Sequence, residues 1–371
     1  MKRETVLFIF CLFIFHMTYT QELSDSNFLS LVFAGDVMGH DSQINSAYND
    51  SAKLYEYDSC FEYIAPFIHK ADIAVANLEV TLAGEPFKGY PQFSSPDALG
   101  MALKNAGFDV LITANNHSLD RGKKGLERTV QMLDSFKIIH TGTFIDSVER
   151  ERKYPLILEK NNIRLAILNY TYGTNGLVVD SPNIVNYIDT LLIMSDLTKA
   201  DSACPDFTIV TMHWGKEYQR TENSYQRKLA RMMLKQGADI IIGMHPHVVQ
   251  PITKEYPDIS DSSFFNIVVY SLGNYISNQR NRYTDGGIMF CFELMKVNDD
   301  TKMITYNYLP TWVFKPKKNN KTLFKIIPAV SHEKGLGENV IDDDSREAMK
   351  LFYDDTRSLL KDVSENSYFV E

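Results

Sequence analysis

The sequence predicts an α/β protein with much parallel strand pairing. Short runs rich in β-branched residues end in polar or glycine-containing turns, and helical patterns follow them. A strand followed by a helix, repeated along the chain, is typical of a sheet with parallel strands. From Asn266 onward the strand-like runs follow one another without helices, which predicts an antiparallel edge or a second sheet.

The expected elements alternate along the chain. Apolar runs of strand length predict strands at 30–34, 72–76, 110–113, 163–169, 208–212 and 240–243. Amphipathic periodicity between these runs predicts helices at 61–70, 96–106, 122–136 and 224–236. The later part of the chain adds expected strands at 267–272, 287–294, 303–309 and 311–314, and an acidic amphipathic helix at 342–363.

Length and composition describe an ordinary globular chain. Its 371 residues can form one large or two modest domains, and 22 Phe and 20 Tyr suggest a large aromatic core. The formal net charge of −9 argues against a nucleic-acid backbone as the main partner. A local cationic site is still allowed, especially where metal ions supply the positive charge.

The N-terminus carries the pattern of an export signal. Met1-Lys2-Arg3 is basic, and residues 6–15 form an apolar run of the length found in signal peptides. Such a run is too short to span a bilayer comfortably. We therefore expect residues 1–20 to be cleaved near Thr20 or kept as an anchor, which predicts a periplasmic, extracellular or membrane-anchored location in the cell envelope.

Polar residues follow the expected strands at their carboxyl ends. In open α/β sheets the site lies beyond these ends, so the polar side chains are expected to meet. The last cluster is His245-Pro246-His247, where alternate residues of an extended chain point the same way and Pro246 fixes φ. The clusters contain Asp36, Asn77, Glu79, Asn116, His117, His213, His245 and His247.

The chemistry of these side chains predicts a metal centre. Two carboxylates, one amide oxygen and three imidazoles suit divalent Zn, Mn or Fe, and they match calcium poorly. Six ligands exceed the needs of one closed tetrahedral site. Two ions bridged by a carboxylate would use them well, so we expect one or two divalent metal ions as cofactor.

Five segments contain these residues, and a sixth lies further along the chain: Gly35-Asp36-Val37-Met38, Ala76-Asn77-Leu78-Glu79, Ala114-Asn115-Asn116-His117-Ser118-Leu119-Asp120, His213-Trp214-Gly215-Lys216-Glu217-Tyr218, Gly243-Met244-His245-Pro246-His247 and Ser271-Leu272-Gly273-Asn274-Tyr275. Together they resemble the CapA family, which is linked to poly-γ-glutamate capsule synthesis and is similar to calcineurin-like metallophosphatases. The resemblance covers roughly residues 28–295, in the family's order. It implies a four-layer αββα sandwich with C-terminal strands and a terminal helix, with a CapA-like domain at 28–315 and an extension at 316–371.

The resemblance also implies a set of metal ligands. Glu79 stands where metallophosphatases usually place a bridging aspartate. The usual Asp-x-His start is absent because Met38 occupies the histidine position, and His40 compensates only if the loop curls back. This departure predicts a weakly bound first metal or a single metal. The implied ligands are Asp36, Glu79, Asn116, His213, His245 and His247.

Other residues of the matching segments are candidates for catalysis and substrate binding. His117 resembles the catalytic neighbour of the amide ligand, although a hydrogen-bonding role without catalytic duty is equally open. Asp120 either orients His117 or caps the helix that follows. Glu217 and Tyr218 either contact substrate or form a structural loop above Trp214. Gly273-Asn274 is interpreted as turn chemistry.

The resulting function is a metal-dependent hydrolase of the cell envelope. A metal-bound hydroxide would attack a phosphoester or a γ-glutamyl amide, with an anionic cell-envelope polymer or its precursor as partner. The alternative is a non-catalytic polymer-binding or scaffolding component of a membrane capsule-synthesis or export complex. A third reading, a nucleotidase-like enzyme, lacks an identifiable aromatic base clamp in the sequence.

Overall fold

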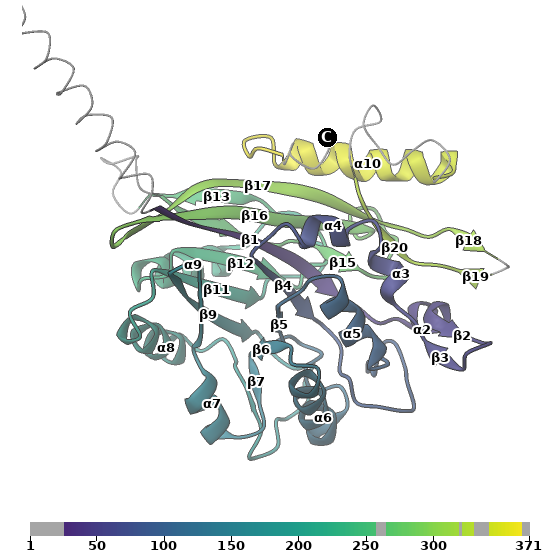
Figure 1. Ribbon diagram of the computed structural model, residues 1–371, viewed down its shortest axis with the longest axis horizontal. Coiled ribbons are helices and arrows are strands. Elements are labelled where there is room, and N and C mark those ends of the chain that lie inside the picture. The colour runs from purple at the N-terminus through teal and green to yellow at the C-terminus, as the bar shows by residue number, and fades with distance from the viewer. Residues whose placement is uncertain (1–25, 257–264, 319–320, 330–340, 366–371) are drawn as a thin grey trace, which may run out of the picture.

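The computed structural model describes residues 26–256, 265–318, 321–329 and 341–365 (Figure 1). The expected export segment, residues 1–20, lies outside these ranges. Within them, no helix combines the length and the apolarity needed to cross a bilayer.

The first sheet is eight-stranded and mixed. Its order is β20-β17-β16-β1-β4-β5-β6, with β15 paired to the end of β1. The strands β1, β4, β5, β6 and β15 pair in parallel, whereas β16, β17 and β20 pair in the antiparallel sense. Their bounds are β1 Ser26–Val37, β4 Ile73–Leu78, β5 Val110–Ile112, β6 Ile139–Thr141, β15 Asn274–Ile276, β16 Gly286–Val297, β17 Asp300–Phe314 and β20 Lys325–Pro328.

The second sheet is six-stranded with the order β13-β14-β12-β11-β9-β8. Its central strands are parallel, and an antiparallel strand closes each edge. The bounds are β8 Leu156–Lys160, β9 Ile163–Thr171, β11 Phe207–His213, β12 Ile240–Met244, β13 Ile252–Glu255 and β14 Asn266–Val269.

Side-chain alternation along the strands builds four layers. In β1, Leu31 and Phe33 enter the core between the two sheets, while Val32 and Ala34 face the opposite side. That opposite side is covered by α3 (Asp58–Phe61), α4 (Ala65–Ile68) and α5 (Ala98–Asn105). The outer face of the second sheet is covered by α8 (Thr190–Ser202) and α9 (Ser224–Lys235). The predicted αββα sandwich is therefore confirmed.

The remaining elements lie at the margins of the sandwich. The acidic helix α10 (Asp343–Leu359) begins after Asp342, whose side chain accepts from the backbone N–H of Ser345. It packs Met349 and Phe352 into the core beside β17. The others are α2 Asp41–Ala47, β2 Tyr48–Asn49, β3 Leu54–Tyr55, α6 Gly122–Ser135, β7 Thr143–Phe144, α7 Ser147–Lys153, β10 Ile184–Val185, β18 Lys317–Lys318 and β19 Lys321–Thr322.

The expected helix at 61–70 and the expected strands around Pro310 differ from the structure. In place of the helix expected at 61–70, α3 ends at Phe61 and the separate helix α4 begins at Ala65. Pro66 lacks the N–H that a continuous helix needs, and it lies in the first turn of α4. The strands expected at 303–309 and 311–314 are one strand, β17. Pro310 lies within it opposite Ile288, and its carbonyl accepts from the N–H of Ala329.

Candidate metal centre

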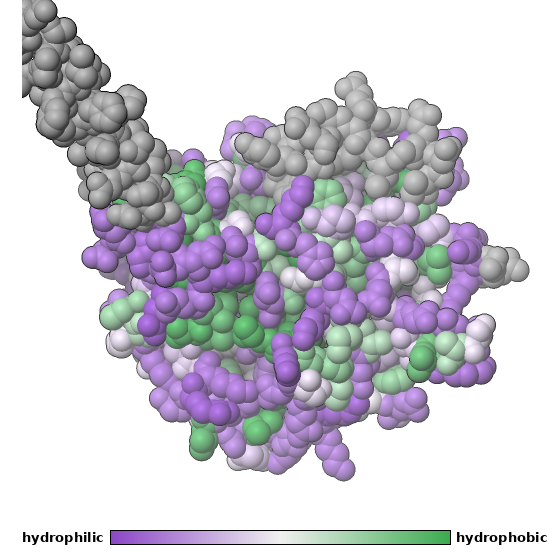
Figure 2. All heavy atoms as spheres, viewed as in Figure 1, coloured by the Kyte–Doolittle hydropathy of each residue, from purple (hydrophilic) through white to green (hydrophobic). Residues whose placement is uncertain are grey.

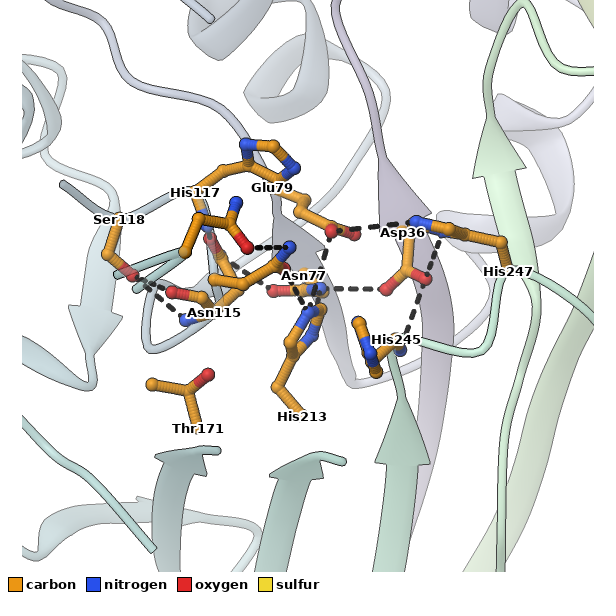
Figure 3. A network of polar contacts seen from close by, with 12 residues as sticks. Asp36, Asn77, Glu79, Asn115, His117, Ser118, Thr171, His213, His245 and His247 are labelled. Atoms are coloured by element: carbon orange, nitrogen blue, oxygen red, sulfur yellow. Dashed lines mark hydrogen bonds and ion pairs between the residues drawn. The ribbon is translucent and has the colours of Figure 1, made fainter. Parts of the chain in front are cut away.

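The predicted metal ligands meet where the carboxyl ends of the two sheets approach each other (Figure 3). The first sheet supplies the carboxylates and the amide, from the end of β1 and from the residues after β4 and β5. The second sheet supplies the imidazoles, from the end of β11 and from the residues after β12. All of these side chains are buried: Asp36, Glu79, Asn116, His213, His245 and His247.

Glu79 joins two groups of possible metal ligands. One group is Glu79, His213 and His245, and the other is Asp36, Glu79 and His247. In each group the ligand atoms lie within 4.8 Å of one another. A carboxylate shared by two ligand groups is the arrangement that bridges two divalent ions.

Buried polar atoms without partners support metal binding. Both carboxylate oxygens of Glu79 and Nδ1 of His245 are buried and have no hydrogen-bond partner. Leaving such atoms unpaired costs free energy, and a cation in each group would satisfy them. Carboxylates with imidazoles are the donors that Zn, Mn and Fe prefer, so the residues present fit the expected ions.

Asn116 extends the first of these groups. Its Oδ1 lies 2.6 Å from Nε2 of His213, and the same Nε2 lies 3.4 Å from Oε1 of Glu79. The side chain of Asn175 accepts from Nδ2 of Asn116 at 3.2 Å, which turns Oδ1 toward the cluster. Amide, carboxylate and imidazole donors thus converge from both sheets.

Asn77 was present in the sequence clusters but was not assigned a role. Its Nδ2 donates to Oδ1 of Asp36 at 2.8 Å and lies 3.3 Å from Nδ1 of His213. Its Oδ1 accepts from Nδ2 of Asn115 at 3.2 Å. Asn77 therefore holds Asp36 and His213 in position, as a second layer of hydrogen bonds does around metal ligands.

Two further residues at the site were missed or misread. Asn274, interpreted as turn chemistry, places Oδ1 3.1 Å from Nδ1 of His247. The ring of Tyr172, after β9, lies 4.5 Å from that of His245 and stacks at 6.3 Å on His213. The signal for Tyr172 was its place at the carboxyl end of a predicted strand, which holds equally for many residues without a role.

The group of Asp36, Glu79 and His247 has no substitute for the missing histidine. Met38 is buried in the core between the first sheet and its covering helices. His40 belongs to neither ligand group; its Nδ1 lies 3.0 Å from Oε1 of Gln43 and 3.3 Å from the backbone nitrogen of Asn278. The group of Asp36, Glu79 and His247 therefore contains a single imidazole.

His117 is held by Asp120 beside the cluster. Nδ1 of His117 lies 2.8 Å from Oδ2 of Asp120, which also accepts from the N–H of Phe93 at 2.7 Å. The Phe93 ring packs edge-on against the imidazole at 4.6 Å. Helix α6 begins at Gly122 with Arg121 at its N-cap, so the capping interpretation of Asp120 was wrong. Asp120 orients His117.

Glu217 and Tyr218 lie at the mouth of the site. Tyr218 is half exposed, and its ring centroid lies 6.2 Å from that of His247. The backbone N–H of Tyr218 donates to the carbonyl of Pro246 at 2.8 Å. Glu217 is close enough to raise the pKa of Glu79. Trp214 is fully buried beneath, and its Nε1 donates to the carbonyl of Tyr270 at 3.0 Å.

Burial sets the charge state of the metal-free cluster. Burial, and after it the charge of Asp36, holds the pKa of Glu79 well above its usual range. Burial, and after it His245, lowers the pKa of His213 well below its ordinary value, and burial lowers that of His245 to about 3. The lowered pKa values favour neutral imidazoles, which are the form that binds metals.

Gly243 is required by close packing beneath the histidines. A Cβ at this position would lie 2.0 Å from the carbonyl oxygen of Tyr270 and 2.4 Å from Nε1 of Trp214. We expect Gly243→Ala to lower the free energy of unfolding by about 1–3 kcal/mol, measured by denaturant unfolding. Gly173→Ala is the control, since a Cβ added at Gly173 would have no atom within 4 Å. Equal stability of the two variants would contradict this packing.

Comparisons with known proteins place the chain in a family. The model of the family "Bacterial capsule synthesis protein PGA_cap" matches residues 30–279. The chain is 28% identical over 281 residues to "PGA biosynthesis protein CapA" of Bacillus subtilis (strain 168), covering 72% of this chain and 68% of that protein. It is 27% identical over 263 residues to "Capsule biosynthesis protein CapA" of Bacillus anthracis, covering 68% of this chain and 60% of that protein.

Similar solved structures include phosphoesterases. One is the calcineurin-like phosphoesterase YfkN from Bacillus subtilis, with 14% identity, a TM-score of 0.43, and coverage of 91% of this chain and 98% of that chain. Another is the NAD nucleotidase of Haemophilus influenzae, with 12% identity, a TM-score of 0.49, and coverage of 89% and 63%. Likeness at this level carries no argument about activity. The match to the family model spans most of the chain, so this protein belongs to the bacterial capsule synthesis protein family PGA_cap.

Proposed function

We propose that this protein is an exported, metal-dependent hydrolase that acts on a capsule or cell-envelope polymer, or on its precursor. The observation that carries the proposal is the buried Glu79 carboxylate, which has no hydrogen-bond partner and is shared by two ligand groups. Export is supported by the basic start and apolar run of residues 1–20. The polymer is supported by the names of the relatives, one of which is a PGA biosynthesis protein.

The ligand residues divide the work of holding the ions. His213, His245 and Asn116, with Glu79, would hold one, and Asp36 and His247, with Glu79, would hold the other. A bound divalent ion supplies Lewis acidity and lowers the pKa of a water molecule that it holds toward neutrality. Asn77 keeps Asp36 and His213 in place throughout, because it contacts both.

His117 is the residue that would exchange a proton with substrate. Asp120 accepts a hydrogen bond from Nδ1–H of His117, which leaves Nε2 as the ring atom available to the substrate. A donor there would stabilise the negative charge that develops as the bond breaks. Phe93 packs on the same imidazole and restricts its rotation.

Hydrolysis assays test this proposal directly. The purified chain, loaded in turn with Zn, Mn and Fe, is assayed on γ-glutamyl peptides and on phosphomonoesters and phosphodiesters. We expect turnover of at least one class, and its loss in Glu79→Gln, which removes the shared carboxylate. The γ-glutamyl amide is the first substrate to test because of the relatives' names.

The second candidate is a polymer-binding or scaffolding component without catalysis. It is favoured by Met38, which leaves the group of Asp36, Glu79 and His247 with one imidazole. In that case neither wild type nor Glu79→Gln hydrolyses γ-glutamyl peptides or phosphoesters. The wild-type protein still binds metal and polymer.

A further inference from the structure

Five cationic side chains gather beyond the metal centre without carboxylate partners. We call them the cationic strip. No carboxylate among the described residues lies within 4.0 Å of their nitrogens, whereas neighbouring Lys325 pairs with Glu62 at 2.7 Å. Unpaired clustering of positive charge is unexpected in a chain with a net charge of −9. The strip consists of Arg280, Lys315, Lys317, Lys318 and Lys321.

The outer part of the strip is a two-stranded ribbon with two lysines in backbone register. β18 and β19 pair in the antiparallel sense, with Lys318 directly opposite Lys321 and Lys317 opposite Thr322. Like charges in direct register destabilise a two-stranded ribbon. Lysines at a sheet edge also discourage edge-to-edge pairing, but that role requires no such register. Nζ of Lys321 donates to the carbonyl of Tyr48, whereas Lys317 and Lys318 are exposed to solvent and free to meet an anion.

The inner part of the strip holds two cations against aromatic rings. Nζ of Lys315 donates to Oδ1 of Asn278 at 2.5 Å and lies 5.0 Å from the Phe324 ring centroid. The Arg280 guanidinium donates to the carbonyl of Val313 at 2.7 Å and lies over the Trp312 ring. Burial, and after it the charge of Arg280, lowers the pKa of Lys315 to about 8. Arg280 and Lys315 therefore repel each other where both are partly desolvated, and the charge of Asp285 offsets part of this repulsion at Arg280.

A chain of contacts links Lys315 of the strip to His117 at the metal centre. Asn278, which accepts from Lys315, donates its backbone N–H to Nδ1 of His40 at 3.3 Å. The His40 ring packs on Phe93 at 5.4 Å, and Phe93 packs on His117 at 4.6 Å. In Figure 1, β18 and β19 extend on the side toward which β1 and β4 point, and Figure 2 shows mostly hydrophilic residues around them.

We propose that the cationic strip is a second binding site, which holds the carboxylates of an extended polycarboxylate chain while another part of that chain lies at the metal centre. A chain with several carboxylates matches a set of cations without carboxylate hydrogen bonds that runs from Lys315, which a chain of contacts links to His117, to the exposed Lys317 and Lys318. The identity of the polymer rests on the proposed function; the existence of an anion site rests on the strip alone.

A binding measurement on metal-free protein tests the strip separately from catalysis. Fluorescently labelled poly-γ-glutamate is titrated with the full-length protein in the presence of a chelator, and anisotropy is recorded at low and high salt. The variant Lys317→Gln with Lys318→Gln changes two exposed side chains. The matched control is Lys228→Gln with Lys235→Gln, two exposed lysines on α9.

We expect the strip variant to bind the polymer about tenfold more weakly and with less salt dependence, while the α9 control binds like wild type. Equal affinities of wild type and strip variant would overturn the proposal. So would tight binding of polyphosphate together with weak binding of poly-γ-glutamate, which would point to a different anion.

The outcome for the strip is distinguishable from that for the hydrolase. Hydrolysis of a short γ-glutamyl peptide, too short to reach the ribbon, reports on the metal centre alone, and the strip variant should retain it. Strip-dependent polymer binding without any hydrolysis would remove the proposed hydrolase and leave the strip. Hydrolysis together with polymer binding that does not depend on the strip would keep the proposed hydrolase and remove the strip.

Discussion

His117→Gln is expected to lower kcat by roughly 10²–10⁴-fold, with little change in KM or in metal content. Glutamine keeps a polar side chain near Asp120 but cannot exchange a proton. Since His117 belongs to neither ligand group, metal binding should survive the substitution. The measurement is steady-state kinetics on the substrate class found active, with metal content determined on the same sample.

Asp120→Asn is the companion variant to His117→Gln. Asp120 acts through His117, which it contacts at 2.8 Å, so a smaller fall in kcat and a shifted pH profile are expected. Asp120 also accepts from the backbone of Phe93, so thermal unfolding of this variant must be checked. Full activity of His117→Gln, with metal bound, would contradict the assignment of His117 as the proton-exchanging residue.

Metal binding is expected to stabilise the fold by a large amount. A ligand that binds only the native state adds about 4 kcal/mol when its free concentration is a thousand times its dissociation constant. The metal-free cluster contains a buried carboxyl with unpaired oxygens, so the gain should be clear as a rise in Tm of several degrees. Thermal unfolding with chelator and with added Zn or Mn measures it.

The pH dependence of this stabilisation has a definite sign. The raised pKa of Glu79 contributes stability to the metal-free fold that is lost as pH rises through that pKa. The lowered pKa values of His213 and His245 oppose this only below the ordinary histidine value of 6.5. Metal displaces the proton of Glu79, so the metal-induced rise in Tm should grow with pH until the raised pKa of Glu79 is passed. A rise of equal size in Glu79→Gln would contradict this origin.

The sequence allowed much of the site to be predicted because strand ends are locally encoded. Asp36, Glu79 and His213 each follow or end an apolar run, and parallel strands bring such positions to one edge. The structure gathers these residues in a single cluster. The family resemblance added the αββα layers, which the packing of both sheets confirms.

Features that depend on how the sheets meet could not be predicted. Tyr172 reaches His245 because β9 and β12 pair with opposite sides of β11, and the residues after both strands meet above its end. Asn274 reaches His247 because β15 pairs with the end of β1. The cationic strip joins Arg280 to Lys315, Lys317, Lys318 and Lys321, and no local pattern relates Arg280 to these lysines. Met38 could be identified as a departure, but whether His40 replaced it depended on the path of the loop.

The most direct test of the metal centre is metal content by elemental mass spectrometry on the purified protein, beside Glu79→Gln and His245→Ala. The shared position of Glu79 predicts that its variant loses metal from both ligand groups, whereas His245→Ala loses it from one. The expected result is stoichiometric Zn, Mn or Fe in wild type, less metal in His245→Ala, and the least in Glu79→Gln. A wild-type protein that is metal-free and takes up no added metal would contradict the centre.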